Sequence, residues 1–437
     1  MQFDPHELFF NDLDRYWHVG SELLRALPLQ RVTLPEHEPL PPRMALVRLP
    51  EWGSELGIDG HIPLPAHLSP GVSKWEDVDW PLAGFWYLHG LAERAFEKKH
   101  GPIHSYAFRL KGWDERLWSH AWVNRIALFL RRWGARNLQK DEVEIFGPLP
   151  EPEIIFTHDV DAVRKTTAIR CKQSAFHLIN AGRSLLEKKA SRAKDKFAQA
   201  VRFFFSNHDY WCFDQLISLE KQYGVRSCFN IYGGVGRHRS LKQRLFDPSY
   251  DVLEPKLTQQ LQRLHQGGWT IGLHQSYDAW ANAGLMREEK DRLEKALNVK
   301  ITTCRQHWLR FSWEHTWQAQ QEAGLELDTT LGFNDRPGFR NGAALRFHPL
   351  DLATGQAMKL QSLPLVLMDS HLYDYLDFDD EQRAREIKRW IDEIRHVHGA
   401  ASVLWHPQAL SSDYGWDCGF KALLEFLRRK NDSQGCP

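Results

Sequence analysis

Short apolar runs alternate with amphipathic stretches through residues 153–407. Seven apolar runs predict buried strands, at 153–159, 226–233, 269–274, 299–311, 325–333, 363–372 and 401–407. Between them, apolar residues recur at helical spacing at 213–224, 254–268, 286–298, 313–324 and 380–399. Several of these stretches end in glycine, as helices commonly do. Strands alternating with helices predict an α/β domain with a largely parallel sheet.

The first part of the chain has a different pattern. Proline-rich loops occupy 34–43 and 61–70, and two helices are predicted at 81–101 and 114–134. The stretch GPLPEPE, 147–153, is typical of a linker. We therefore expect an α+β N-terminal accessory domain at 1–150, with a packing or substrate-framing role, and a second domain at 151–437.

Bulk properties exclude some classes of function. The 437 residues contain 56 Lys and Arg against 56 Asp and Glu, so no overall field favours nucleic acid, and we expect no nucleic-acid partner. No apolar segment matches a secretory signal or a membrane span, and the six cysteines form no CxxC pair. These features favour free thiols and a cytoplasmic protein. The 18 tryptophans raise the expectation of carbohydrate binding slightly.

One basic segment interrupts the α/β pattern at about 164–205. Between Arg164 and Arg202 there are 11 Lys and Arg against two acids, with leucine, isoleucine and phenylalanine interspersed. Two interpretations remain open. The segment is either a solvated helical insertion or a patch that docks an anionic membrane surface or a lipid-phosphate carrier. The second would make the protein peripheral at the inner membrane.

Polar residues gather where the predicted strands end. They are Asp159, Asp161, His274, Arg305, His307 and His406. Carboxyl ends of parallel strands are where α/β folds place ligands. A single strand-end aspartate is more often a cap or turn residue, and a single histidine is more often structural. Their joint occurrence in four distant segments favours a site.

The chemistry of this set favours a metal. One aspartate with one or two histidines suits zinc or a similar divalent ion. A second aspartate, kept ionised by an arginine, can take a proton from water, and a histidine can protonate a leaving amine. The set therefore predicts metal-assisted hydrolysis of an amide-like bond.

Five short segments also resemble a known family. They are THDVD (157–161), GWTIGLHQSYDAW (268–280), RQHWLRF (305–311), LDTTLGF (327–333) and VLWHP (403–407). In this order they resemble polysaccharide deacetylases of the NodB-homology type, carbohydrate esterase family four, over about 153–425. The resemblance implies a distorted (β/α) barrel of seven or eight strands. The N-terminal region resembles a domain appended to the barrel in a bacterial subgroup of the family, whose genes occur near those for surface-polysaccharide functions.

The resemblance implies a role for each matched residue. Asp159 would be the base and Asp161 a metal ligand, with His274 as the first metal histidine. Arg305 would orient the base, and the backbone N–H of Trp308 would help stabilise the oxyanion. His406 would be the acid.

Two departures from the family pattern affect the metal site. The position of the usual second metal histidine is Asp278, and the proline of the third motif is His307. We expect His307 to supply the missing ligand, with Asp278 as the alternative. The residue Val160 also changes the spacing of the two acids. Asp328, Asp369 and His371 end other strands, and no role is assigned to them.

Together these features predict a metal-dependent carbohydrate deacetylase, with zinc the expected ion. Its substrate would be an N-acetylated glycan or sugar precursor of a bacterial surface polysaccharide. One rival is a catalytically inactive glycan-binding or scaffold protein on the same fold. Another is a deformylase or amidohydrolase acting on a lipid-linked sugar.

Overall fold

The structure is a computed structural model that describes residues 3–35, 37–68, 74–186, 188–234, 240–376 and 378–428. Eight parallel strands form the central sheet, in the order β10-β7-β6-β5-β4-β3-β12-β11. They are β3 (Glu153–Val160), β4 (Cys228–Tyr232), β5 (Thr270–Gln275), β6 (Thr303–Gln306), β7 (Leu327–Asp328), β10 (Gln361–Ser362), β11 (Leu365–Met368) and β12 (Ala400–Leu404).

The sheet curls on itself. On β6, the Arg305 side chain donates from Nη2 to Ser402 Oγ on β12 at 3.1 Å, although three strands separate β6 from β12. A flat sheet would hold these strands almost 20 Å apart, at about 4.8 Å per strand. The fold is therefore a distorted, open (β/α) barrel of eight strands, and the predicted fold class is confirmed.

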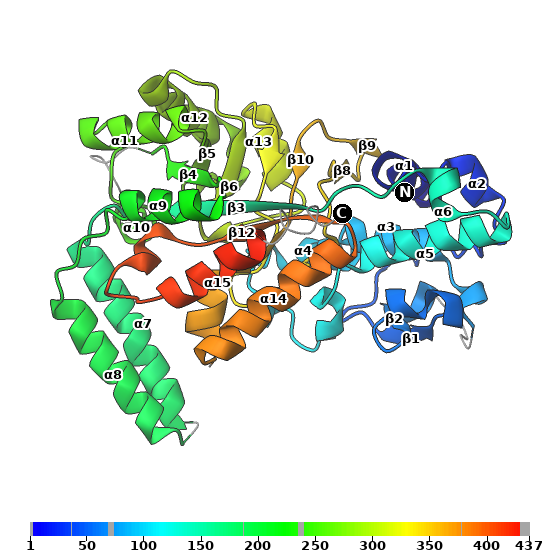
Figure 1. The fold of residues 1–437 in the computed structure, drawn as a ribbon, viewed down its shortest axis with the longest axis horizontal. Coiled ribbons are helices and arrows are strands. Elements are labelled where there is room, and N and C mark those ends of the chain that lie inside the picture. The colour runs from blue at the N-terminus through cyan, green and yellow to red at the C-terminus, as the bar shows by residue number, and fades with distance from the viewer. Residues whose placement is uncertain are drawn as a thin grey trace.

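Helices cover the outside of the sheet (Figure 1). They are α9 (Phe213–Tyr223), α11 (Pro255–Gln266), α12 (Ala283–Leu297), α13 (Thr316–Glu322), α14 (Asp380–His396) and α15 (Asp417–Arg428). The short helix α10 (Leu241–Phe246) lies instead at the edge of the barrel, where the carbonyl of Phe246 is 2.7 Å from His307 Nε2. A small antiparallel pair, β8 (Leu350–Asp351) and β9 (Gln356–Ala357), lies beside them. The predicted strand at 299–311 is much shorter in the structure. It ends at Gln306 because the chain turns into η7 (His307–Leu309), where Trp308 has φ 58°.

Two long helices are inserted between β3 and the crossover helix α9. The basic segment forms α7 (Thr167–Leu186) and α8 (Ala190–Phe205), which pack side by side and extend away from the barrel at the lower left of Figure 1. At the base of this hairpin, Lys165 Nζ donates to Asp413 Oδ2 at 2.7 Å. Both groups are almost fully buried, so the base is held firmly.

The N-terminal segment is mostly helical. It contains α1 (Pro5–Trp17), α2 (Ser21–Arg25), an antiparallel pair β1 (Met44–Arg48) and β2 (His61–Pro65), α3 (Trp80–Leu88), α4 (Leu91–His100), α5 (Trp122–Asn137) and α6 (Glu142–Phe146). The two predicted helices are each broken. Gly90, whose left-handed backbone conformation (φ 60°) breaks the helix, separates α3 from α4. A side chain would not fit there, because a Cβ would lie 2.5 Å from the Trp313 ring. A short 3₁₀ turn, η5 (Glu115–Trp118), precedes α5.

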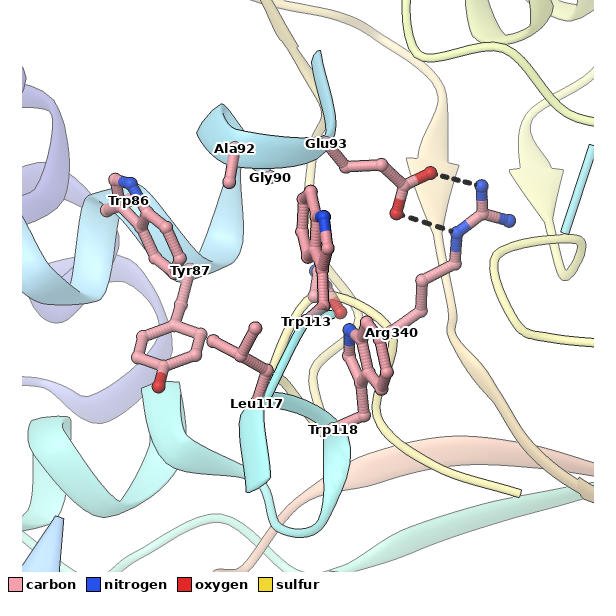
Figure 2. A pocket seen from close by; sticks show the side chains of 10 residues that line it. Trp86, Tyr87, Gly90, Ala92, Glu93, Trp113, Leu117, Trp118 and Arg340 are labelled. Carbon is pink, nitrogen blue, oxygen red and sulfur yellow. Dashed lines mark hydrogen bonds and ion pairs between the residues drawn. The ribbon is translucent and has the colours of Figure 1, made fainter. Parts of the chain in front are cut away.

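The N-terminal segment and the barrel share one apolar core. Buried ion pairs also join them: Arg125 on α5 contacts Glu393 on α14 at 2.6 Å, and Glu93 on α4 contacts Arg340. Figure 2 shows Glu93 and Arg340 facing each other beside Trp113 and Trp118. The cavity there is about 20 Å³, roughly the room of one water molecule. It is too small for a sugar.

Most tryptophans build this core. Eleven of the 18 are buried, so their number carries no argument for a sugar-stacking surface. The five cysteines that the structure describes are free thiols. Within the described ranges, no helix has both the length and the apolar character needed to cross a bilayer.

Candidate active site

Six side chains predicted from strand ends meet at one edge of the barrel. Asp159 is the second-last residue of β3, Asp161 directly follows the end of that strand, and His274 is on β5. Arg305 is on β6, and His307 follows in η7. His406 comes two residues after β12. Parallel pairing places Asp159 beside Asn230 on β4, and His274 beside Arg305. The edge is therefore assembled by sheet register.

Three of these side chains form a compact cluster that could hold a metal. Asp161 Oδ1 lies 3.2 Å from His274 Nε2 and 3.4 Å from His307 Nδ1. One ligand atom from each residue lies within 4.8 Å of the other two. Asp161 Oδ1 is buried and has no hydrogen-bond partner among the described groups. Such an oxygen is costly to bury unless a cation or donor meets it.

The outer ring nitrogens orient both histidines toward this oxygen. His274 Nδ1 lies 3.0 Å from the carbonyl of Arg305, and His307 Nε2 lies 2.7 Å from the carbonyl of Phe246. A carbonyl only accepts, so each of these nitrogens carries the proton. The inner nitrogens then present lone pairs to each other at 2.7 Å, where they repel unless a cation or a further proton lies between them. Outer-nitrogen hydrogen bonds of this kind are the usual support of metal-binding histidines.

The donor set therefore fits a divalent metal. One carboxylate oxygen and two imidazole nitrogens are ligands that zinc and similar ions accept. Burial lowers the pKa of His307 to about 3, so its ring is neutral, the form that binds a metal. Asp278 lies apart from the cluster. Its exposed carboxylate pairs with Lys242 at 2.7 Å and Arg310 at 3.1 Å.

Asp159 is nearly fully buried beside the cluster. Its Oδ1 accepts from Asn230 Nδ2 at 2.8 Å and from Arg305 Nη1 at 3.3 Å, and its Oδ2 lies 4.0 Å from His274 Nδ1. Burial raises the pKa of Asp159, but the charges of Arg305, His274 and His406 outweigh it and hold the pKa below its usual value. The carboxylate is therefore ionised and fixed in orientation.

Arg305 and Asn230 hold this carboxylate in place. The buried Arg305 guanidinium also donates to Thr157 Oγ1 at 2.6 Å and to the carbonyl of Thr329 at 2.9 Å, so it crosses the barrel interior. Gly272 leaves the space that Asn230 occupies, because a Cβ on it would lie 2.5 Å from Asn230 Oδ1. Sequence reasoning missed Asn230, which lies inside an apolar strand rather than at its end.

His406 faces the cluster from β12. Its Nε2 lies 3.6 Å from Asp161 Oδ2, and its Nδ1 donates to Asp369 Oδ1 at 2.8 Å. The backbone N–H of His406 donates to Asp369 Oδ2 at 2.7 Å. Burial lowers the pKa of His406, but Asp369, Asp161 and Asp159 raise it to about 10. Asp369 directly follows β11, and that strand-end position was its only sequence signal.

The other strand-end residues support the fold. Asp328 accepts from Trp317 Nε1 at 3.0 Å and from Gln320 Nε2 at 2.9 Å, so it braces α13. His371 donates to the carbonyl of Phe333 at 2.9 Å. Trp308 keeps its ring at the edge of the site, with Lys172 Nζ from α7 4.1 Å from the ring centre.

Comparisons with known proteins place the chain near one group of solved structures. No family model and no curated protein matches it. A proposed polysaccharide deacetylase from Mycobacterium smegmatis is 18% identical, with a TM-score of 0.37, over 64% of this chain and 85% of that one. A polysaccharide deacetylase from Bacillus cereus is 11% identical, with a TM-score of 0.30, over 64% and 89%. A CE4 family pseudoenzyme from Bacillus anthracis is 10% identical, with a TM-score of 0.28, over 65% and 62%. The chain is thus similar in fold to structures of carbohydrate esterase family four (CE4) over about two thirds of its length.

Proposed function

We propose that this protein is a metal-dependent hydrolase that removes an N-acetyl or similar acyl group from a sugar. The observation that carries this proposal is the cluster of three candidate metal ligands. Beside it lie the Asp159 carboxylate, which hydrogen bonds hold in place, and His406, which is hydrogen-bonded to Asp369. The sugar would belong to a bacterial surface polysaccharide or its precursor. The ion would be divalent, with zinc the first choice for an Asp-His-His set.

Amide hydrolysis needs a base for water and an acid for the amine. A metal held by Asp161, His274 and His307 would supply Lewis acidity at the acyl carbonyl and lower the pKa of water. Asp159 would accept the proton of the attacking water, because both of its described donors contact Oδ1 and Oδ2 is left to receive it. Arg305 keeps that carboxylate ionised between turnovers.

His406 would protonate the departing amine. Asp369 fixes its Nδ1–H and leaves Nε2 facing Asp161, where the reacting amide would sit. The raised pKa of His406 keeps its ring protonated at neutral pH, as a general acid requires. A buried carboxylate that orients a histidine in this way is a general device of acid–base catalysis.

The test is acetate release from N-acetylated sugar oligomers by the metal-loaded protein. We expect Asp159→Asn and His406→Ala each to lower turnover by about two to four decades with unchanged folding. Asp278→Asn is the matched control, because the Asp278 carboxylate pairs with Lys242 and Arg310 outside the cluster, and this variant should retain activity. Wild-type turnover in both site variants would refute the assignment.

A non-catalytic scaffold on this fold would give a different result. It would purify without metal and fail to take up zinc, cobalt or nickel, and the His274→Ala variant would behave like the wild type. Lipid-linked sugars belong in the same activity assay, because α7 lies against the site through Lys172 and Trp308. Acyl release from a lipid-linked sugar alone would favour a peripheral, inner-membrane role in the cytoplasm.

A further inference from the structure

The α7–α8 hairpin packs its two helices with small side chains. The buried seam positions are Ser174, Ala181 and Ser184 on α7, and Ala193, Ala200 and Phe203 on α8. Ser174 Oγ donates across the seam to the carbonyl of Ala200 at 3.0 Å. Apart from Phe203, the seam consists of serine and alanine, which let the helices approach closely but bury little apolar area. Most of the larger apolar side chains therefore lie elsewhere.

Those larger side chains point outward. Leu186 is 86% exposed and Phe205 is 77% exposed, and six further apolar residues on the hairpin are also exposed: Leu178, Ile179, Leu185, Phe197, Val201 and Phe204. On α8 they fall at positions 197, 201, 204 and 205, which is one helical stripe. Single exposed apolar residues are normal, but a large contiguous apolar patch on a folded protein usually marks a binding surface. Outside this hairpin the structure describes nine exposed large apolar residues, and five of them are scattered over the N-terminal segment, so no other part of the described chain has this density.

The segment that contains this hairpin is strongly positive. Eleven Lys and Arg and two acids lie between Arg164 and Arg202, so this segment has a net charge of +9 in a chain that is neutral overall. Lys188 and Lys194 are exposed next to the turn and on α8. Apolar stripes bordered by lysine and arginine are typical of helices that lie in the interface of an anionic bilayer.

The hairpin is also fixed relative to the candidate site. Lys165 at its base is bound to Asp413 of the barrel, and Arg170 Nη1 on α7 ties the two helices together by donating to the carbonyl of Phe204 on α8 at 2.8 Å. Lys172 reaches Trp308, the residue next to His307. A surface that docks through this hairpin would therefore hold the site at a set distance from it.

We propose that the α7–α8 hairpin docks the protein on an anionic lipid bilayer. Its outward leucines and phenylalanines enter the headgroup–acyl boundary, and its lysines and arginines contact the anionic headgroups. The positive charge selects a bilayer over a second copy of this chain, because residues 167–205 hold nine Lys and Arg against two acids and two hairpins of charge +7 repel each other. This inference does not depend on the proposed hydrolysis, because it concerns attachment alone.

Vesicle co-sedimentation of the full chain tests the proposal. We expect binding to phosphatidylcholine vesicles that contain phosphatidylglycerol, little binding to phosphatidylcholine alone, and weakening with salt. The Leu186→Ser/Phe205→Ser variant should lose most binding. Lys188→Glu/Lys194→Glu should bind more than about 25-fold more weakly, because each basic residue near the surface contributes about fivefold.

Matched control variants separate the hairpin from general surface effects. Phe108→Ser/Leu138→Ser removes two exposed apolar residues of the N-terminal segment, and Lys98→Glu/Lys99→Glu reverses two exposed lysines of α4. Both should bind vesicles as the wild type does. All hairpin variants should keep wild-type acetate release from soluble sugars, so failure of docking and failure of catalysis are told apart.

Three outcomes would overturn the proposal. The first is equal binding to neutral and anionic vesicles, or none to either. The second is wild-type binding by both hairpin variants. The third is a dimer in light scattering that the Leu186→Ser/Phe205→Ser variant converts to a monomer without any vesicle binding, which would assign the surface to a second copy.

Discussion

Replacing His307 tests how the metal cluster is built. His307 Nδ1 lies 3.4 Å from Asp161 Oδ1 and 2.7 Å from His274 Nε2, whereas Asp278 pairs with Lys242 and lies outside the cluster. We therefore expect His307→Ala to lose metal binding and Asp278→Ala to keep it. The two substitutions are a matched pair, because each removes one candidate for the same ligand position.

The size of the effect follows from binding linkage. Losing an outer partner of a metal ligand costs about 10- to 100-fold in affinity, so losing a ligand should cost at least about 100-fold. At a metal concentration of about 100 times the wild-type Kd, binding stabilises the fold by about 2.7 kcal/mol, and a 100-fold weaker variant gains only about 0.4 kcal/mol. For 437 residues the unfolding entropy is about 0.9 kcal/mol/K, so the metal should raise Tm by about 3 °C in the wild type and by less than about 1 °C in His307→Ala.

The assay is thermal unfolding of chelator-treated protein with and without added zinc. Cobalt titration, followed by its visible absorption, measures affinity separately. Asp278→Ala should show the wild-type shift in both. A full shift in His307→Ala together with its loss in Asp278→Ala would refute the assignment of His307 and restore the family's usual spacing.

Two further predictions concern a positioning carboxylate and a buried acid. Asp369→Asn should lower kcat by about two decades with KM and metal affinity unchanged, because Asp369 acts only by orienting His406. The Asp369→Asn/His406→Ala double variant should then be no slower than His406→Ala alone, and additive losses would contradict this. Burial raises the pKa of Glu289 to about 7, above its ordinary 4.5, so the folded state holds a proton that the unfolded state has lost between these values. The free energy of unfolding should therefore fall by about 3 kcal/mol as pH rises from 4.5 to 7 and stay constant above pH 7. The negative charges of Asp247 and Glu288 also help to raise the pKa of Glu289. Glu289→Gln should remove this part of the slope in denaturant titrations, and an unchanged slope would show that Glu289 ionises normally.

The sequence indicated that these side chains gather because the end of a strand can be recognised from the local pattern. Asp159, His274 and Arg305 each follow an apolar run, and parallel strands bring such ends to one edge without knowledge of the strand order. The substitution of a proline by His307 also pointed to a ligand, and the structure places His307 in the cluster with Asp161 and His274.

Other features depend on which strands become neighbours. Asp369 follows β11, and only the pairing of β11 with β12 brings it to His406. In the sequence, Asp369 and Asp328 occupy the same kind of position at the end of a strand. Asp328 instead accepts a hydrogen bond from Trp317 and holds α13 in place. The early end of β6 could not be predicted either, because the left-handed turn at Trp308 contains no glycine or proline to signal it.

The buried ion pairs between the N-terminal segment and the barrel bear on how the chain can be divided. A fragment beginning at residue 151 would keep Glu393 and Arg340 but lose their partners Arg125 and Glu93. Removing one partner of a buried ion pair lowers the free energy of unfolding by about 3–5 kcal/mol, which is comparable to the whole free energy of unfolding of many domains. We therefore expect heating to melt both parts in a single calorimetric transition, and attempts to express the barrel alone to yield insoluble chains.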